Sequence, residues 1–151
     1  MMSPKFSLQN VLDARHGKVE LLEIELGKLL MMKQKTQSVL ESLEAYQAQI
    51  IEQLNEAQIG EIDLVKLNLL FHDARQIGRD IEAVKLQLKR QAREVEEKRA
   101  ELVRAKQSEE TLQILKRKRR EVYEAEQVQL ETQALDDIYI ARYFHSQRHG
   151  A

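Results

Sequence analysis

The chain has 151 residues, of which 32% are charged and 5% aromatic, with one proline, five glycines, no cysteine and a formal net charge of −1. This composition is typical of long helices and coiled coils and leaves little material for a thick globular core, and the absence of cysteine excludes disulfide and thiolate chemistry. The small net charge gives no general attraction to nucleic acid or to an anionic membrane. Because the sequence shows neither a secretory signal nor a long apolar run, we expect a soluble, cytoplasmic protein without direct membrane insertion.

A first helix is predicted from about residue 4 to residue 58. Ser3 before Pro4 favours a helix start, because proline restricts the residue before it and fits the first helical position. A spacing that alternates between four and three residues then gives a mostly apolar seam of period 3.5, which predicts a left-handed supercoil with a neighbouring helix. The seam positions are Leu8, Leu12, Arg15, Val19, Leu22, Leu26, Leu29, Lys33, Thr36, Leu40, Leu43, Gln47, Ile50 and Leu54.

A turn at about residues 59–63 separates this helix from a second one, predicted from about residue 63 to residue 145 with a tail at 146–151. Gly60 suits a left-handed helix end, and Asp63 suits the N-cap of the next helix. Helices joined by so short a turn lie antiparallel, so the second seam should face the first. Its positions are Leu67, Leu70, Ala74, Ile77, Ile81, Val84, Leu88, Gln91, Val95, Lys98, Leu102, Ala105, Glu109 and Leu112.

The predicted fold is therefore all-α, a single coiled-coil domain over residues 1–151 that forms a two-helix antiparallel hairpin. Matching the helices outward from the turn places Pro4 near residue 117 or 118, so the longer second helix overhangs from about residue 120. A lone helix is marginal in water, and we expect the overhang either to fray or to be held by a partner. Gly17, Gly27 and Gly78 each cost about 1 kcal/mol inside a helix, a cost that long packing can offset.

Adjacent apolar pairs provide a second indication of partners. A two-helix seam needs only a narrow stripe, so the residue beside each seam position should stay exposed and be covered by a partner or by self-association, including a homodimer. The pairs are Val11 with Leu12, Leu21 with Leu22, Leu29 with Leu30, Val39 with Leu40 and Ile50 with Ile51.

No catalytic, cofactor-binding or metal-binding residue is predicted, and we expect a protein that is not an enzyme. His145 and His149 share a helix face at the spacing of metal ligands, but the nearby chain end favours a solvated terminus. The basic run at residues 116–120 suits either a solvated face or protein docking better than nucleic acid, because no aromatic residues interleave with it. Three aromatic residues near the end of the second helix predict an interface; they are Tyr139, Tyr143 and Phe144.

The opening segment, residues 6–15, resembles the start of the FliJ family of flagellar export proteins, with a phenylalanine, a leucine-rich step and an arginine. The resemblance continues through Gly60, an apolar patch with Phe71, the segment 94–99, Ala105 and Leu115. It implies a two-helix coiled coil similar to the central stalk of rotary ATPases. The end of this coiled coil that carries both termini would insert into the ring of the hexameric export ATPase. It also implies partners in the cytoplasmic domain of the export gate and in empty export chaperones, and a peripheral position at the inner membrane through protein partners.

Carried onto this chain, the resemblance implies two docking regions. The ATPase-docking residues would be Phe6, Leu8, Leu12, Arg15, Lys116, Arg117, Lys118, Arg119 and Arg120, and the gate-facing patch would include Tyr46 and Phe71. A relative that serves a type III secretion apparatus would share these features. The alternative function is a coiled-coil adaptor or scaffold that self-associates and is unrelated to export.

Overall fold

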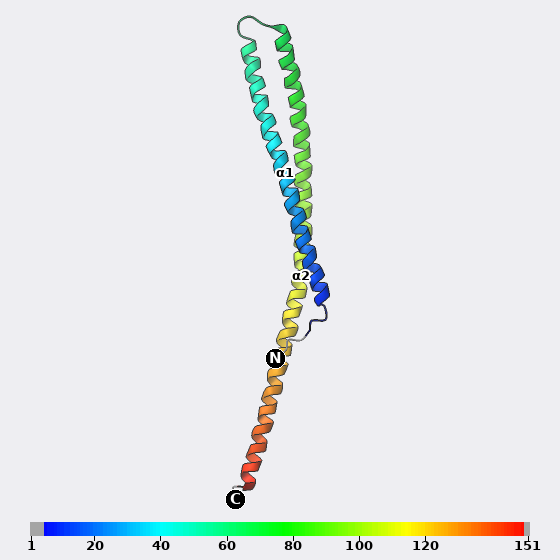
Figure 1. Cartoon of the computed structure of the whole chain (residues 1–151), viewed down its shortest axis with the longest axis vertical. Helices are drawn as coiled ribbons and strands as arrows, with labels where there is room; N and C mark the ends of the chain where they lie inside the picture. Colours follow the sequence, from blue (N-terminus) through cyan, green and yellow to red (C-terminus); the bar gives the residue numbers. More distant parts are fainter. Residues whose placement is uncertain (1–4, 150–151) are drawn as a thin grey trace. The chain divides into compact units, whose positions relative to one another are not determined.

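The computed structural model describes residues 5–149, with side chains described through Arg148. It contains two helices, α1 (Gln9–Ala57) and the longer α2 (Leu64–His149), and the described residues include no strand. The two helices pack against each other as an antiparallel hairpin, which confirms the predicted fold class (Figure 1). The chain divides into two compact units, which we name the hairpin unit (Glu20–Arg104) and the terminal unit (Met1–Val19 with Ala105–Ala151). The single domain stays a prediction.

The core of the hairpin unit is the seam that the sequence predicted. One buried cluster combines two residues of each helix, with partly buried residues packed around it. Every predicted seam position, in this unit and in the terminal unit, is buried or half-buried. The alternating spacing therefore locates the contact face of both helices, because only that spacing keeps the apolar side chains turned toward the partner helix. The cluster consists of Leu40, Ile50, Ile77 and Ile81, with Leu43, Leu54, Ala74, Val84 and Leu88 around it.

The connection between the helices has the predicted chemistry. Gly60 has a φ of 78°, the left-handed conformation that glycine adopts without a steric cost. The Asp63 Oδ1 atom accepts hydrogen bonds from the backbone N–H groups of Val65, at 3.1 Å, and Lys66, at 3.3 Å. Asp63 is thus the N-cap of α2 and satisfies two donors that the first helical turn leaves unpaired.

The start of α1 differs from the prediction. Lys5 and Phe6 have no regular structure, Ser7 and Leu8 form a turn, and the helix begins at Gln9. The Phe6 carbonyl accepts a hydrogen bond from Gln9 N at 3.0 Å, which closes this turn. The physical reason lies on α2, where one arginine, described below, holds the side chains of residues 6 and 7. Ser3 and Pro4, where the sequence placed the helix start, lie outside the described residues.

The seam of the hairpin unit contains polar residues at several positions. Thr36 is buried and donates from Oγ1 to the carbonyl of Met32 at 3.1 Å. Gln91 is also buried, and its Oε1 atom has no hydrogen-bond partner among the described residues. Such an oxygen carries a desolvation cost that is not offset, so this layer of the seam is less stable than its apolar neighbours.

Lys98 occupies a seam position between two acidic residues. Its Nζ atom donates to Glu25 Oε2 on α1 at 2.9 Å and lies 3.5 Å from Glu101 Oε2 on α2. The hydrogen bond to Glu25 raises the pKa of Lys98 above its ordinary value of 10.5; partial burial opposes this shift, and the Glu101 carboxylate adds to it. The lysine therefore stays charged in the seam and links the two helices.

The apolar residues beside the seam are exposed, as predicted. They lie outside the contact stripe because the stripe is only as wide as one helix can cover. The exposed members of the five pairs are Val11, Leu21, Leu30, Val39 and Ile51.

Neither helix, over the described residues 5–149, is long and apolar enough to cross a membrane.

Candidate docking surface at the basic collar

In the terminal unit, the first turns of α1 pack on α2 from residue 105 onward. Leu12 and Leu112 are both buried in this contact. Arg15, which is half-buried, donates from its guanidinium to the carbonyl of Ser108 at 2.7 Å. Leu12 and Arg15, both expected in the ATPase-docking set, thus hold the two helices together and contribute little open surface.

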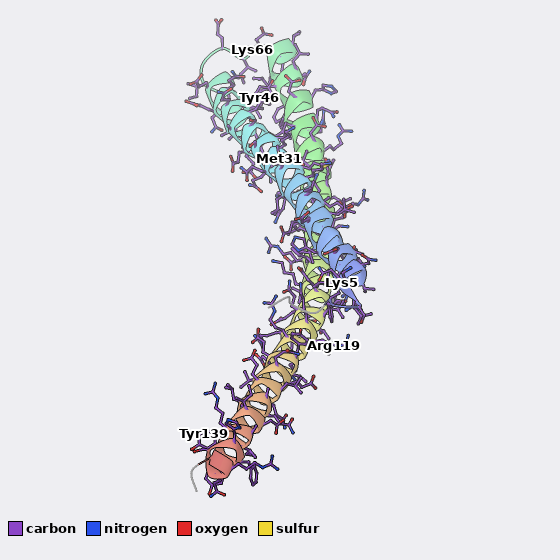
Figure 2. The ribbon with its side chains drawn as sticks, turned by 60° about the horizontal axis from the view of Figure 1, so that its bottom comes forward. Lys5, Met31, Tyr46, Lys66, Arg119 and Tyr139 are labelled. Carbon is purple, nitrogen blue, oxygen red and sulfur yellow. The ribbon has the colours of Figure 1, made fainter. Side chains whose placement is uncertain are left out.

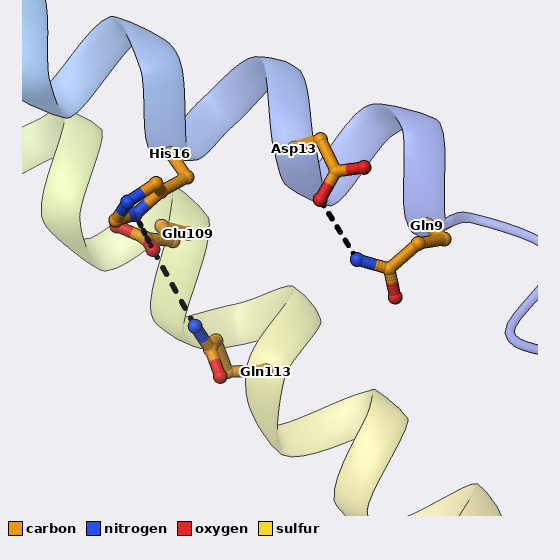
Figure 3. Close-up of polar contacts among 5 residues, drawn as sticks. All are labelled: Gln9, Asp13, His16, Glu109 and Gln113. Atoms are coloured by element: carbon orange, nitrogen blue, oxygen red, sulfur yellow. Dashed lines mark hydrogen bonds and ion pairs between the residues drawn. The ribbon is translucent and has the colours of Figure 1, made fainter. Parts of the chain in front are cut away.

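A polar cluster flanks this contact (Figure 3). His16 Nδ1 lies 2.6 Å from Glu109 Oε1, and Gln113 donates to the same carboxylate oxygen at 3.4 Å. On α1, Gln9 donates to Asp13 Oδ1 at 2.8 Å, within one helical turn. Of these pairs, only His16 with Glu109 crosses between the helices, and it links them at one flank of the seam.

The segment before α1, residues 5–8, folds against α2 and is called the strap below. Arg119 donates from its guanidinium to Ser7 Oγ at 2.9 Å, and its Cζ atom lies 5.4 Å from the centroid of the Phe6 ring. A guanidinium at this distance over an aromatic face is attracted by the ring quadrupole. Arg119 therefore holds Phe6 and Ser7 of the strap beside the basic run. The ATPase-docking role of this region stays a prediction.

The basic run Lys116–Arg120, called the collar below, lies at this point of α2. Lys116 is half-buried, and the next four residues are exposed. Arg117 has a long contact with Glu121 at 3.9 Å, whereas the cationic groups of Lys116, Lys118 and Arg120 have no ion pair within the described part of the chain. The collar is thus an exposed concentration of positive charge.

A groove of about 230 Å³ runs between the strap and the collar. Apolar groups from Phe6, Val122 and Tyr123 line it, and Lys116, Arg119 and Arg120 surround them together with Lys5 and Glu126. Such a surface suits a protein segment that combines apolar and acidic side chains, because both kinds of group find a complement.

Beyond the groove, from Val128 onward, α2 has no other element beside it among the described residues. Every side chain from Val128 to Arg148 is exposed, and Tyr139 is 74% exposed (Figure 2). Tyr143 and Phe144, also exposed, form an edge-to-face pair with centroids 5.9 Å apart. The predicted C-terminal interface residues therefore lie on an open helix, where a partner could reach all three.

Tyr46 and Phe71, the residues expected to face the export gate, are both exposed in the hairpin unit. The register places them on opposite flanks of the seam. Tyr46 shares the heptad position of Glu25, on the flank where Lys98 binds, whereas Phe71 lies on the flank of Ile51. A partner that binds both residues must reach around the hairpin, so the two do not form one compact patch.

Sequence reasoning missed several residues of the groove. Lys5, Val122 and Tyr123 line it, and Ser7 accepts the hydrogen bond of Arg119 beside it, yet the sequence predicted none of the four as a site residue. The signal was available in part, because matching the helices outward from the turn already placed residue 4 near residue 117 or 118. The strap itself was hidden, because it depends on a contact between residues 112 positions apart in the chain.

Within residues 5–149, no group of three or more histidine, aspartate or glutamate side chains is placed to hold a metal ion. The side chain of His149 lies outside the described part, and the predicted pairing with His145 stays untested.

Together, the fold and the collar define a two-helix coiled-coil protein with an exposed basic, partly apolar surface and an open helix. Searches of curated proteins and of solved structures found no significant match. A scan against family models matched residues 4–148 to the family described as "Flagellar FliJ protein". The chain therefore belongs to the FliJ family and is a protein associated with flagellar export.

Proposed function

We propose that this protein is a non-enzymatic, cytoplasmic stalk for the ring of the flagellar export ATPase. The observation that carries the proposal is that α2 continues past the collar as an open helix whose described side chains are all exposed from Val128 onward. A helix with exposed aliphatic and aromatic residues and no partner of its own is stabilised by entering a partner's cavity. The collar and the groove then lie at the base of the inserted helix, where charge complementarity would orient the ring.

A second role, as an escort for export chaperones that also contacts the export gate, is supported by the exposed apolar residues of the hairpin unit. Methionines are common on surfaces that bind several partners, because their side chains adapt to different shapes, and two adjacent ones are exposed on α1, Met31 and Met32. Contact with the gate would bring the protein to the inner membrane as a peripheral component. An adaptor unrelated to export agrees less well with the family to which the chain belongs.

The stalk proposal is tested by mixing the protein with a hexameric flagellar export ATPase and measuring ATP hydrolysis and ring formation. We expect the wild-type chain to increase both. The double variant Arg117→Glu with Lys118→Glu changes only exposed collar residues and spares the strap. Reversing two charges at the rim of an interface should raise the concentration needed for half-maximal stimulation by about tenfold.

A matched control is available on the same helix. Lys89 and Arg90 are an adjacent exposed basic pair in the hairpin unit, so Lys89→Glu with Arg90→Glu makes the same charge change away from the collar. This control should stimulate hydrolysis as the wild type does. Absence of stimulation by the wild-type chain would reject the stalk role, and equal losses in both double variants would reject the collar as its docking site.

A further inference from the structure

The turn between α1 and α2 carries a dense group of exposed aliphatic side chains (Figure 1). Ile59, at 76% exposure, is the most exposed large hydrophobic residue among those that the structure describes, and Val65 is 71% exposed. Five such residues fall within eleven positions of the chain, and none of them occupies a seam position. We call them the tip cluster; they are Ile59, Ile62, Leu64, Val65 and Leu69.

The local structure does not require these side chains. Gly60 provides the left-handed backbone of the turn, and Asp63 caps α2. The hydrogen bond from Ile59 N to the Glu56 carbonyl, at 3.1 Å, uses only backbone atoms. Turns favour glycine, asparagine, aspartate and serine, so isoleucine brings no advantage there. Aliphatic groups that gather on the surface where neither packing nor the backbone needs them indicate a site that contacts another protein or a membrane.

The charge around the tip cluster distinguishes between these occupants. Residues 52–66 contain four carboxylates and one lysine, a local net charge of −3, whereas the whole chain has −1. Glu56, Glu61 and Asp63 line a hollow of about 570 Å³ together with Ile59 and Lys66. Neither Glu56 nor Glu61 has an ion pair with any side chain that the structure describes. The tip cluster is therefore an apolar surface with an acidic rim.

This acidic rim opposes two of the occupants that an apolar surface could have. A second copy of the tip, or an anionic membrane, would bring like charges together around the buried aliphatic groups. The carboxylates would also lose hydration if the cluster entered a hydrocarbon phase. A protein surface with an apolar centre and a rim of lysine or arginine complements both parts of the cluster at once.

We propose that the tip cluster docks onto a partner protein whose apolar surface is rimmed by lysine or arginine, with one basic side chain entering the acidic hollow. The inference goes beyond the proposed functions, which use the collar, the open helix and the flanks of the hairpin and place no contact at the turn. Its test requires neither the export ATPase nor the export gate. Its failure and the failure of those functions are therefore distinguishable.

The probe is a synthetic amphipathic helical peptide with a leucine face rimmed by lysines, compared with a counterpart that has glutamate in place of every lysine. Because the chain has no cysteine, Gln58→Cys takes a single environment-sensitive dye beside the tip cluster, and its emission reports binding at this place. The lysine peptide should bind the full chain with a Kd of about 100 μM or lower, and the glutamate peptide at least about tenfold more weakly.

Two variants in the labelled chain remove the apolar and the acidic parts of the site in turn. Ile59→Ser with Ile62→Ser changes two residues that lie outside both helices, and should weaken binding of the lysine peptide by about tenfold. Glu61→Lys, also outside both helices, should weaken it by about fivefold, because it reverses one charge of the rim. Circular dichroism should show unchanged helicity in both variants.

Matched controls are available in the same unit. Ile24→Ser with Leu86→Ser removes two exposed aliphatic residues away from the turn, and Glu97→Lys reverses one exposed charge there. Both controls should bind the lysine peptide as the wild type does. Equal losses in the controls and in the tip variants would overturn the proposal. A wild-type chain that does not bind the lysine peptide at about 1 mM, or that binds both peptides equally, would overturn it as well.

The other occupants are tested with the chain alone and with lipid vesicles. Sedimentation should show no dimer that depends on the tip cluster, and no binding to vesicles of phosphatidylcholine with or without phosphatidylglycerol. A dimer that is lost in Ile59→Ser with Ile62→Ser would overturn the proposal and identify a second copy as the occupant. Vesicle binding that is lost in the same variant would overturn it and identify a membrane.

Discussion

In the hairpin unit, α1 and α2 cover each other's seam, and the cluster around Ile50 and Ile81 is almost completely withdrawn from solvent. In the terminal unit, α2 loses this cover beyond the collar, and all of its described side chains from Val128 onward are exposed. Both units contain a stretch of α2. In the hairpin unit its seam positions are mostly apolar, whereas beyond Leu112 the same spacing reaches Lys116, Arg119, Glu126 and Gln133. The difference shows that this protein has a stable core where an apolar seam meets a partner helix.

The largest effect should come from the core of the hairpin unit. Ile50 is 2% exposed, and Ile50→Ala leaves a cavity that should lower the free energy of unfolding by about 2–5 kcal/mol. Ile51→Ala, on the exposed neighbour, and Leu135→Ala, on the open helix, should each change it by about 0.5 kcal/mol or less. Urea unfolding followed by circular dichroism measures all three. Similar losses for Ile50 and Leu135 would contradict the contrast between the units.

A smaller effect of opposite sign is expected at the polar layer. Gln91→Leu removes the buried Oε1 atom that has no partner among the described residues, and should raise the free energy of unfolding by about 1–3 kcal/mol. Gln87→Leu, at an exposed position four residues earlier, is the control and should have little effect. Thermal unfolding measures both. A destabilised Gln91→Leu variant would show that the amide makes a favourable contact.

The glycines allow each unit to be stabilised separately. A Cβ atom at Gly17 or Gly78 would meet nothing within 4 Å, so alanine there should stabilise the helix by about 1 kcal/mol. Gly17→Ala should slow amide hydrogen exchange in the terminal unit, and Gly78→Ala in the hairpin unit. Gly60→Ala should destabilise by about 1 kcal/mol, because a left-handed φ is strained for alanine. If Gly17→Ala or Gly78→Ala slowed amide hydrogen exchange equally in both units, the two units would unfold as one cooperative structure.

The smallest effect concerns pH. The folded chain holds the Lys98 proton more tightly than the unfolded chain, because its pKa is raised by Glu25. This contribution to stability is complete below a pH of about 10.5 and is lost as the pH rises through the folded pKa. Above this pH, the melting temperature of the wild type should therefore fall relative to that of Lys98→Met. If the difference between the two melting temperatures stayed constant up to pH 11, the ionisation of Lys98 would not contribute to stability.

These contrasts also explain what the sequence could predict. The alternating spacing located every seam position, Gly60 and Asp63 identified the turn, and the doubled apolar positions were found exposed. Each of these features depends on residues close together in the chain. The strap was missed and α1 was predicted to start too early, because the position of Phe6 and Ser7 depends on Arg119. The sequence also did not predict that Tyr46 and Phe71 lie on opposite flanks of the hairpin, because their placement follows from the register of one helix on the other.

The polar seam residues limit how the hairpin can misfold. In the native alignment, Glu25 accepts the hydrogen bond of Lys98, and the register places Lys33 opposite Gln91. If the two helices slipped by one heptad in one direction, apolar residues would still meet apolar residues along much of the seam, but Lys33 would face Lys98. Two ammonium groups in a shared, partly dry layer repel each other and lose their hydration. A repetitive leucine seam that tolerates several alignments is thus restricted by a few charged side chains to one of them, at a modest cost in stability.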